Sequence, residues 1–120
     1  MLNIRIDNIG DLAIVECEGR IVQSGAAFKL RDAVTSQSDA RTVVVDLSEV
    51  HALEGGGLGM LIFLQRWAGD HGIGFKLFNP SKSVRERLKL VSSLAEFDIS
   101  TLDEMMALLG NANSLYAIAA

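Results

Sequence analysis

The glycine-rich segment Glu-Gly-Gly-Gly-Leu-Gly at residues 54–59 is the part of the sequence that most suggests a binding or catalytic site. It joins a β-branched run, Thr-Val-Val-Val-Asp-Leu at residues 42–47, to an apolar segment that begins near residue 57. Consecutive backbone amides at a strand-to-helix junction can bind an anion, helped by the positive end of the helix dipole. The same kind of junction can also present a catalytic nucleophile on a sharp turn. Each chemistry needs further side chains close by.

Those further side chains are missing from the glycine segment. A nucleotide-binding loop has a lysine directly after its glycines, whereas no Lys or Arg occurs between Arg41 and Arg66, and Glu54 adds a negative charge. A nucleophile would have to be Ser, Cys or Thr, and the segment contains none. His51 and His71 lie in separate segments, with nothing that marks either as a general base. The sequence therefore indicates a protein that is not an enzyme and needs no cofactor.

Composition excludes two further classes. The chain has 120 residues, which fits one domain with a single core. Its 11 basic residues against 15 acidic ones give a net charge of −4, and the basic residues are scattered rather than gathered on a phosphate-binding face, so we expect no nucleic-acid partner. Cys17 is the only cysteine, which excludes an internal disulfide and a multi-cysteine metal site. We expect Cys17 to fill space in the core.

The pattern of charged and apolar residues also indicates where in the cell the protein is located. Residues 1–10 alternate polar and apolar side chains and carry charge early, which is a strand pattern and not that of a signal peptide. The uncharged stretch from Gly55 to Gln65 is far shorter than the roughly 20 residues that cross a bilayer. We expect a cytoplasmic protein that does not insert into the membrane.

The elements that must position the glycine segment follow from periodicity. Alternation around a Gly-Asp turn predicts a hairpin, with Gly19 closing its second strand. Ser24 is the expected N-cap of the first helix, Thr101 and Glu104 form a capping box, and Gly110 is the expected stop of the last helix. The predicted elements, in order, are strands at 3–7 and 11–18, a helix at 24–37, a strand at 41–47, a helix at 57–69, a strand at 73–78, and helices at 81–94 and 100–110.

This order predicts an α/β fold in one domain. Strand-helix-strand units need right-handed crossovers, so the sheet should be mixed, with its helices packed largely on one face. We expect the domain to span residues 1–110 and residues 111–120 to form a C-terminal tail beyond the stop signal.

Several short motifs occur in an order that resembles a known family. They are the segment at residues 19–34, Asp46-Leu47-Ser48, Gly57-Leu58-Gly59, and Asn79-Pro80 followed by an amphipathic helix. From about Gly10 to Leu109 the chain resembles the STAS domain, the family of bacterial anti-sigma factor antagonists. The resemblance implies the STAS fold and a binding function without catalysis. The partner it implies is an anti-sigma factor that is a histidine-kinase-like ATPase, or a related signalling protein.

In that family the turn reads Asp-Ser-Ser-Gly-Leu-Gly or close to it, and its first Ser is phosphorylated by the partner. A phosphate adds roughly −1.5 to −2 charge at the contact surface, and only the unphosphorylated antagonist binds the anti-sigma factor. Here Glu54 takes the position of the Asp, Gly55 that of the acceptor Ser, and Gly56 that of the second Ser. The resemblance thus implies that no phosphorylation occurs at this loop. Two alternatives follow: an antagonist that this loop cannot turn off, which we favour, or a docking module outside the kinase circuit.

The resemblance also indicates where a partner would bind. The expected partner-binding residues are Glu54, Gly55, Gly56, Gly57 and Leu58, with Met60 and Ser24 at the margin. The next helix carries a stripe of Met60, Phe63 and Trp67, which is either core against a neighbouring helix or an exposed patch beside the turn. Two other functions remain open: an accessory STAS subunit of a lipid or anion transport system, and a nucleotide-binding sensor.

Overall fold

The chain begins with an antiparallel hairpin. The computed structural model describes the backbone of residues 1–119 and the side chains of residues 1–112. Strand β1 (Leu2–Ile9) pairs with β2 (Leu12–Ile21), and Gly10 turns between them with a φ of +59°. A positive φ is a conformation that glycine adopts without a steric penalty. The hairpin predicted around the Gly-Asp turn is confirmed.

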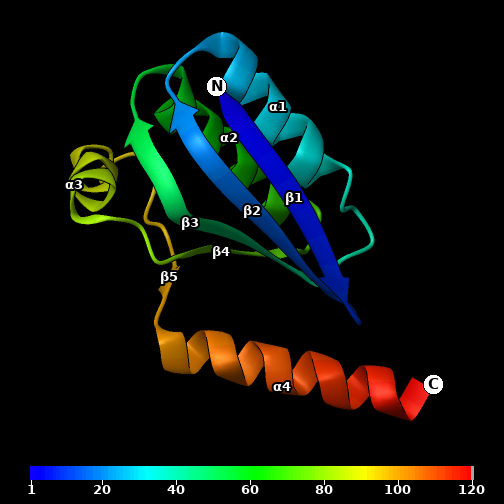
Figure 1. The fold of residues 1–120 in the computed structure, drawn as a ribbon. Helices are drawn as coiled ribbons and strands as arrows, with labels where there is room; N and C mark the ends of the chain where they lie inside the picture. Colours follow the sequence, from blue (N-terminus) through cyan, green and yellow to red (C-terminus); the bar gives the residue numbers. More distant parts are fainter. Residues whose placement is uncertain (120) are drawn as a thin grey trace.

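The rest of the sheet is parallel and is built by crossovers. The remaining strands are β3 (Thr42–Leu53), β4 (Gly74–Phe78) and β5 (Ile99–Ser100), and the connecting helices are α1 (Ser24–Thr35), α2 (Gly56–Asp70) and α3 (Lys82–Leu90). The strand order is the chain order, β1-β2-β3-β4-β5, and only the β1–β2 pair is antiparallel. Right-handed crossovers between successive neighbours bring all three helices to one face, as Figure 1 shows. The predicted mixed sheet is confirmed.

Both faces of the central strand are buried. In β3, Val43 and Val45 belong to the main core beneath α1, α2 and α3, whereas Val44 belongs to a second cluster on the opposite face. The second cluster is completed by Met105 and Ala112 of α4 (Leu102–Ala119). The long β-branched run of β3 is therefore explained by burial on two sides. The helices lie largely on one face, as predicted, with α4 alone on the other.

Several predicted boundaries are wrong. β3 continues to Leu53 rather than ending at residue 47, and α3 ends at Leu90 rather than at residue 94. Ser24 does not cap α1: Gln23 is the extended N-cap residue, and Ser24 is already helical. β2 does not end at Gly19 but continues to Ile21. Gly19 has a φ of +122° and lies where the β2–β3 register shifts. Because it has no side chain, the backbone of Met1 can approach it closely. The last helix passes through Gly110, because packing on both sides of it, at Met105 and Ala112, offsets the roughly 1 kcal/mol that a mid-helix glycine costs.

The capping box predicted at the start of the last helix is confirmed. Thr101 and Glu104 exchange two hydrogen bonds, from each backbone N–H to the side chain of the other, both at 3.1 Å. Ser81 caps α3 by accepting a bond from the N–H of Val84 at 3.3 Å. The two-residue strand β5, which carries the chain into α4, was not predicted.

Cys17 gives this fold a testable pH dependence. The side chain is buried in the main core, as expected, and burial, followed by the charge of Asp46, raises the pKa of its thiol from 9.0 to about 12. Between these values the unfolded chain loses the thiol proton while the folded chain keeps it. The free energy of unfolding should therefore fall with rising pH in that window by up to about 1.4 kcal/mol per pH unit, and show no such loss below it.

Urea unfolding over this pH range, with Cys17→Ala as the control, checks the prediction. The slope against pH should be smaller in Cys17→Ala than in the wild-type protein, because the variant lacks the thiol. Equal slopes in the two proteins would show that the thiol ionises equally in the folded and unfolded chains.

Candidate functional site

Two loops lie side by side where β2 and β3 end. The backbone N–H of Glu54 donates to the carbonyl oxygen of Ile21 at 3.2 Å. A Cβ atom on Gly55 would lie 3.9 Å from the carbonyl oxygen of Val22. Since α1 begins two residues later, the exposed Ser24 is brought to the same end of the sheet as the glycine segment. The structure thus brings the expected marginal residue near the expected central ones.

The three consecutive glycines have three different environments. Gly55 precedes α2 with φ 51° and ψ −115°, a combination that is open to glycine and strained for other residues. Gly56 is exposed, has no unusual φ, and has no atom within 4 Å of where a Cβ would lie. Gly57 is buried, and its Cβ would lie only 2.0 Å from the carbonyl oxygen of Ile21. Of the three, only Gly56 has a conformation and surroundings that would accept a side chain.

The first turn of α2 continues directly from these glycines. The N–H of Gly57 donates to the carbonyl oxygen of Glu54 at 3.0 Å, and that of Gly59 to Gly55 at 3.1 Å. Leu58 and Met60 are half-buried and pack against the main core. The exposed part of the predicted binding segment is therefore Glu54, Gly55 and Gly56, with only the outer parts of Leu58 and Met60 beside them.

Glu54 is held by a basic residue that sequence reasoning missed. Its Oε1 lies 2.7 Å from Nη2 of Arg87 on α3, and each side chain is about half exposed, at 51% and 48%. An exposed pair of this kind contributes at most about 1 kcal/mol to stability, yet it neutralises the charge beside the glycines. The amphipathic pattern places Arg87 on the exposed side of α3 but gives no sign of which acid it meets. Val84 and Leu88, on the buried side, seat the helix where this contact forms.

The outer stripe of α2 fits neither predicted alternative completely. Met60 and Trp67 pack against the main core, whereas Phe63 is 49% exposed. The Trp67 ring also stacks on His71, with ring centroids 4.7 Å apart. Met60 and Trp67, at the two ends of the stripe, therefore pack as part of the core. Phe63, between them, leaves an aromatic ring partly exposed beyond the glycine turn.

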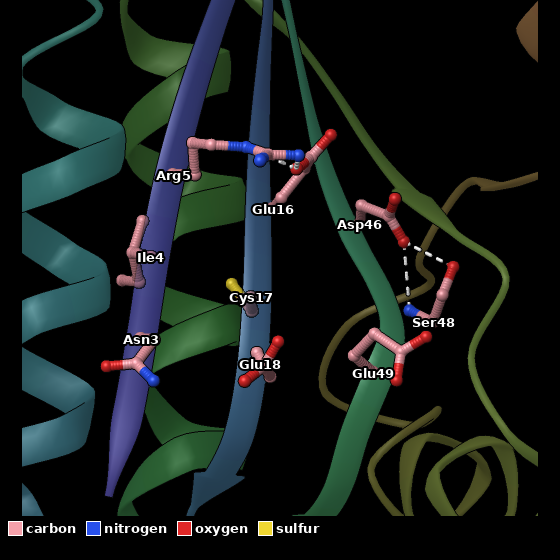
Figure 2. A pocket seen from close by; sticks show the side chains of 9 residues that line it. All are labelled: Asn3, Ile4, Arg5, Glu16, Cys17, Glu18, Asp46, Ser48 and Glu49. Carbon is pink, nitrogen blue, oxygen red and sulfur yellow. Dashed lines mark hydrogen bonds and ion pairs between the residues drawn. The ribbon is translucent and has the colours of Figure 1, made fainter.

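A separate hollow on the sheet face opposite α1 has an acidic lining. The hollow has a volume of about 370 Å³. Figure 2 shows the side chains that line it, with Arg5 pointing toward Glu16. Four carboxylates line it, from Glu16, Glu18, Asp46 and Glu49. The hydrogen bond from Arg5 to Glu16 raises the pKa of the guanidinium above its usual value. Because this lining would repel a phosphate group, the hollow does not favour the nucleotide-sensor alternative.

The described residues offer neither a metal site nor a membrane-spanning helix. Within residues 1–112, no cluster of three His, Cys, Asp or Glu side chains has the geometry to hold a metal ion. Among the helices that the structure describes, none combines the length and the apolar composition required of a membrane span.

Comparison with known proteins found a matching family model and solved structures with a similar fold. A family model described as the STAS domain matches residues 3–105. An anti-sigma factor antagonist from Mycobacterium paratuberculosis has a TM-score of 0.76 at 21% identity, covering 92% of this chain and 95% of that one. The antagonist SpoIIAA in its unphosphorylated form gives 0.68 at 14% identity, with 88% and 94% covered. The Bacillus cell fate determinant SpoIIAA in its phosphorylated form gives 0.67 at 14% identity, with 89% and 99% covered. No curated protein sequence matches the chain.

Proposed function

The chain belongs to the STAS domain family, and from this we propose that it is an anti-sigma factor antagonist whose binding loop is not switched by phosphorylation. It acts in the cytoplasm by binding, without catalysis. Its partner is an anti-sigma factor of the histidine-kinase-like ATPase class. The structural neighbours described as anti-sigma factor antagonists support this assignment.

The observation that carries the proposal is the backbone at Gly55. The residue at the position of the family's acceptor serine has no hydroxyl, and its φ of 51° with ψ of −115° strains any side-chain-bearing residue. A single change back to serine would therefore restore a hydroxyl on a strained backbone. The loop thus lacks the acceptor hydroxyl, and its backbone at Gly55 would not readily accept the serine that could restore it.

The electrostatics favour a loop that is permanently competent to bind. Phosphorylation would add roughly two negative charges and three acceptor oxygens to such a surface. Glu54 adds one negative charge at the neighbouring residue, and Arg87 lies 2.7 Å away and neutralises it. The surface thus resembles an unphosphorylated antagonist more closely than a phosphorylated one. We propose the exposed loop residues Glu54, Gly55 and Gly56, with the outer parts of Leu58 and Met60 and the nearby Ser24, as the contact surface.

The proposal is tested by capture from the native cell lysate in the presence of ATP. We expect the full chain to retain a histidine-kinase-like ATPase as its main catch and to be recovered at its unmodified mass. A switchable antagonist would instead be phosphorylated by its partner and released. Recovery of a heavier bait, with one phosphate added, would contradict the loss of the switch. A transporter subunit as the main catch would contradict the partner class and support the transport alternative.

A further inference from the structure

Strand β1 is an edge strand whose outward backbone groups can be identified. The N–H of Arg20 donates to the carbonyl oxygen of Met1 at 3.3 Å, which marks these two residues as a hydrogen-bonded pair of the antiparallel ladder. Because such pairs alternate with non-bonded ones along the register from Leu2–Gly19 to Ile9–Leu12, every even residue of β1 directs its N–H and C=O away from β2. The outward-facing residues are Leu2, Ile4, Ile6 and Asn8.

Most of this edge is unoccupied by the described part of the chain. Lys29 donates to the carbonyl oxygen of Leu2 at 2.6 Å, which closes the first outward position. No other hydrogen bond within residues 1–112 reaches the outward groups of Ile4, Ile6 or Asn8. In Figure 1, β1 forms the free margin of the sheet, with α1 over one face and α4 below the other. An edge of this length, without proline or bulge, is a template for pairing with another strand.

We propose that β1 pairs antiparallel with β1 of a second copy of this chain, joining two five-stranded sheets into one. The proposal is independent of the function proposed above, since it uses a different surface. A two-fold axis makes each copy offer the same outward groups to the other. Outward-facing residues must pair with outward-facing residues, so the register can shift only in steps that keep even numbers opposite even numbers.

The charges of β1 select one of these registers. With Ile6 opposite Ile6 of the partner subunit, Arg5 lies opposite Asp7 of the partner subunit, and this opposite-charge pair occurs twice. Moving the axis by one residue in either direction would place Arg5 opposite its own copy or Asp7 opposite its own copy. Opposite charges directly across two strands stabilise the pair, and like charges destabilise it. The selected register also brings together the half-buried side chains of Ile6 from the two copies.

The side chains concerned are free to make these contacts. The Arg5 side chain is 75% exposed, and its Nε and Nη2 bond Glu16. Its Nη1 takes part in no hydrogen bond among the described residues. Asp7 is only partly buried and lies on the same strand face as Arg5. The second copy would therefore supply the cross-strand partner that each of these charges lacks on the edge side.

Charge reversal with mixing tests the proposal by sedimentation velocity. We expect the wild-type protein to form a reversible dimer, and Asp7→Arg and Arg5→Asp each to dimerise roughly tenfold more weakly or worse, because like charges then face each other twice. Mixing the two variants should restore association, because each arginine then faces an aspartate. Asn8→Pro should also weaken dimerisation, because it removes an outward N–H without removing a bond to β2.

The matched control is Glu18→Arg, which makes the same change in charge on the neighbouring strand β2. It should dimerise like the wild-type protein, and thermal melts should show that every variant is folded. A wild-type protein that stays monomeric at all concentrations would overturn the proposal. So would variants that dimerise as tightly as wild type, or a mixture that associates no better than its components.

Discussion

A Gly56→Arg variant is expected to keep the thermal stability of the wild-type protein and to bind the anti-sigma factor at least roughly 100-fold more weakly. Gly56 is exposed, and no atom lies within 4 Å of the position that a Cβ would occupy. Arginine also has a better helix propensity than glycine, by nearly 1 kcal/mol. The long side chain would therefore be tolerated by the fold and would project from the proposed contact surface, where it would block the partner.

Calorimetric titration of the partner, together with a thermal melt, checks this result. Gly56→Ala is the control, because a single methyl group improves helix propensity and adds little bulk, so this variant should bind nearly as well as wild type. If Gly56→Arg binds like wild type, the partner contacts another surface. If it unfolds, position 56 has a structural role that its open surroundings do not reveal.

The neighbouring position is expected to behave in the opposite way. Gly57→Ala should lower the free energy of unfolding by about 4 kcal/mol or more, a large share of the roughly 5–15 kcal/mol that holds a domain of this size. The added Cβ would lie 2.0 Å from the carbonyl oxygen of Ile21 and 2.9 Å from Cγ2 of the same residue. Since one obstacle is the backbone of the last residue of β2, α2 and β2 would have to move apart.

Urea unfolding measures this effect, and Gly59→Ala is its matched control. Gly59 lies in the same helical turn, and nothing is within 4 Å of its Cβ position, so this change should stabilise the protein by up to about 1 kcal/mol. A Gly57→Ala variant whose unfolding free energy stays within about 1 kcal/mol of wild type would show that the loop can yield, and the contrast between the two glycines would then be wrong.

The different behaviour expected of neighbouring glycines shows what could not be predicted from the sequence. The order of elements, the turn at Gly10 and the capping box of α4 could be predicted, because each depends on residues close together in the chain. The glycine segment could also be located. The different environments of Gly55, Gly56 and Gly57 could not be predicted, because they depend on how closely each glycine approaches Ile21 and Val22, more than 30 residues away.

The wrong and missing predictions have the same cause, which is contacts between residues far apart in the chain. Glycine commonly ends a helix, so Gly110 was predicted as the end of the last helix. Instead α4 continues past Gly110, because its residues on both sides pack on the second face of the sheet. β5 has only two residues, which is too short for a periodic pattern, and it exists because β4 offers an edge to pair with. The partner of Glu54 was missed because Arg87 reaches it only after α3 has packed on the sheet.

The contacts that hold the loop at residues 54–57 in place affect how a partner would bind to it. Glu54 is tied through its backbone to Ile21 and through its side chain to Arg87, and Gly57 is wedged against the same strand. Such a loop has little conformational freedom left to lose when a partner docks, so the entropic cost of ordering it was met during folding. The proposed binding surface is therefore preorganised, and the affinity of a complex would depend mainly on the contacts made across it.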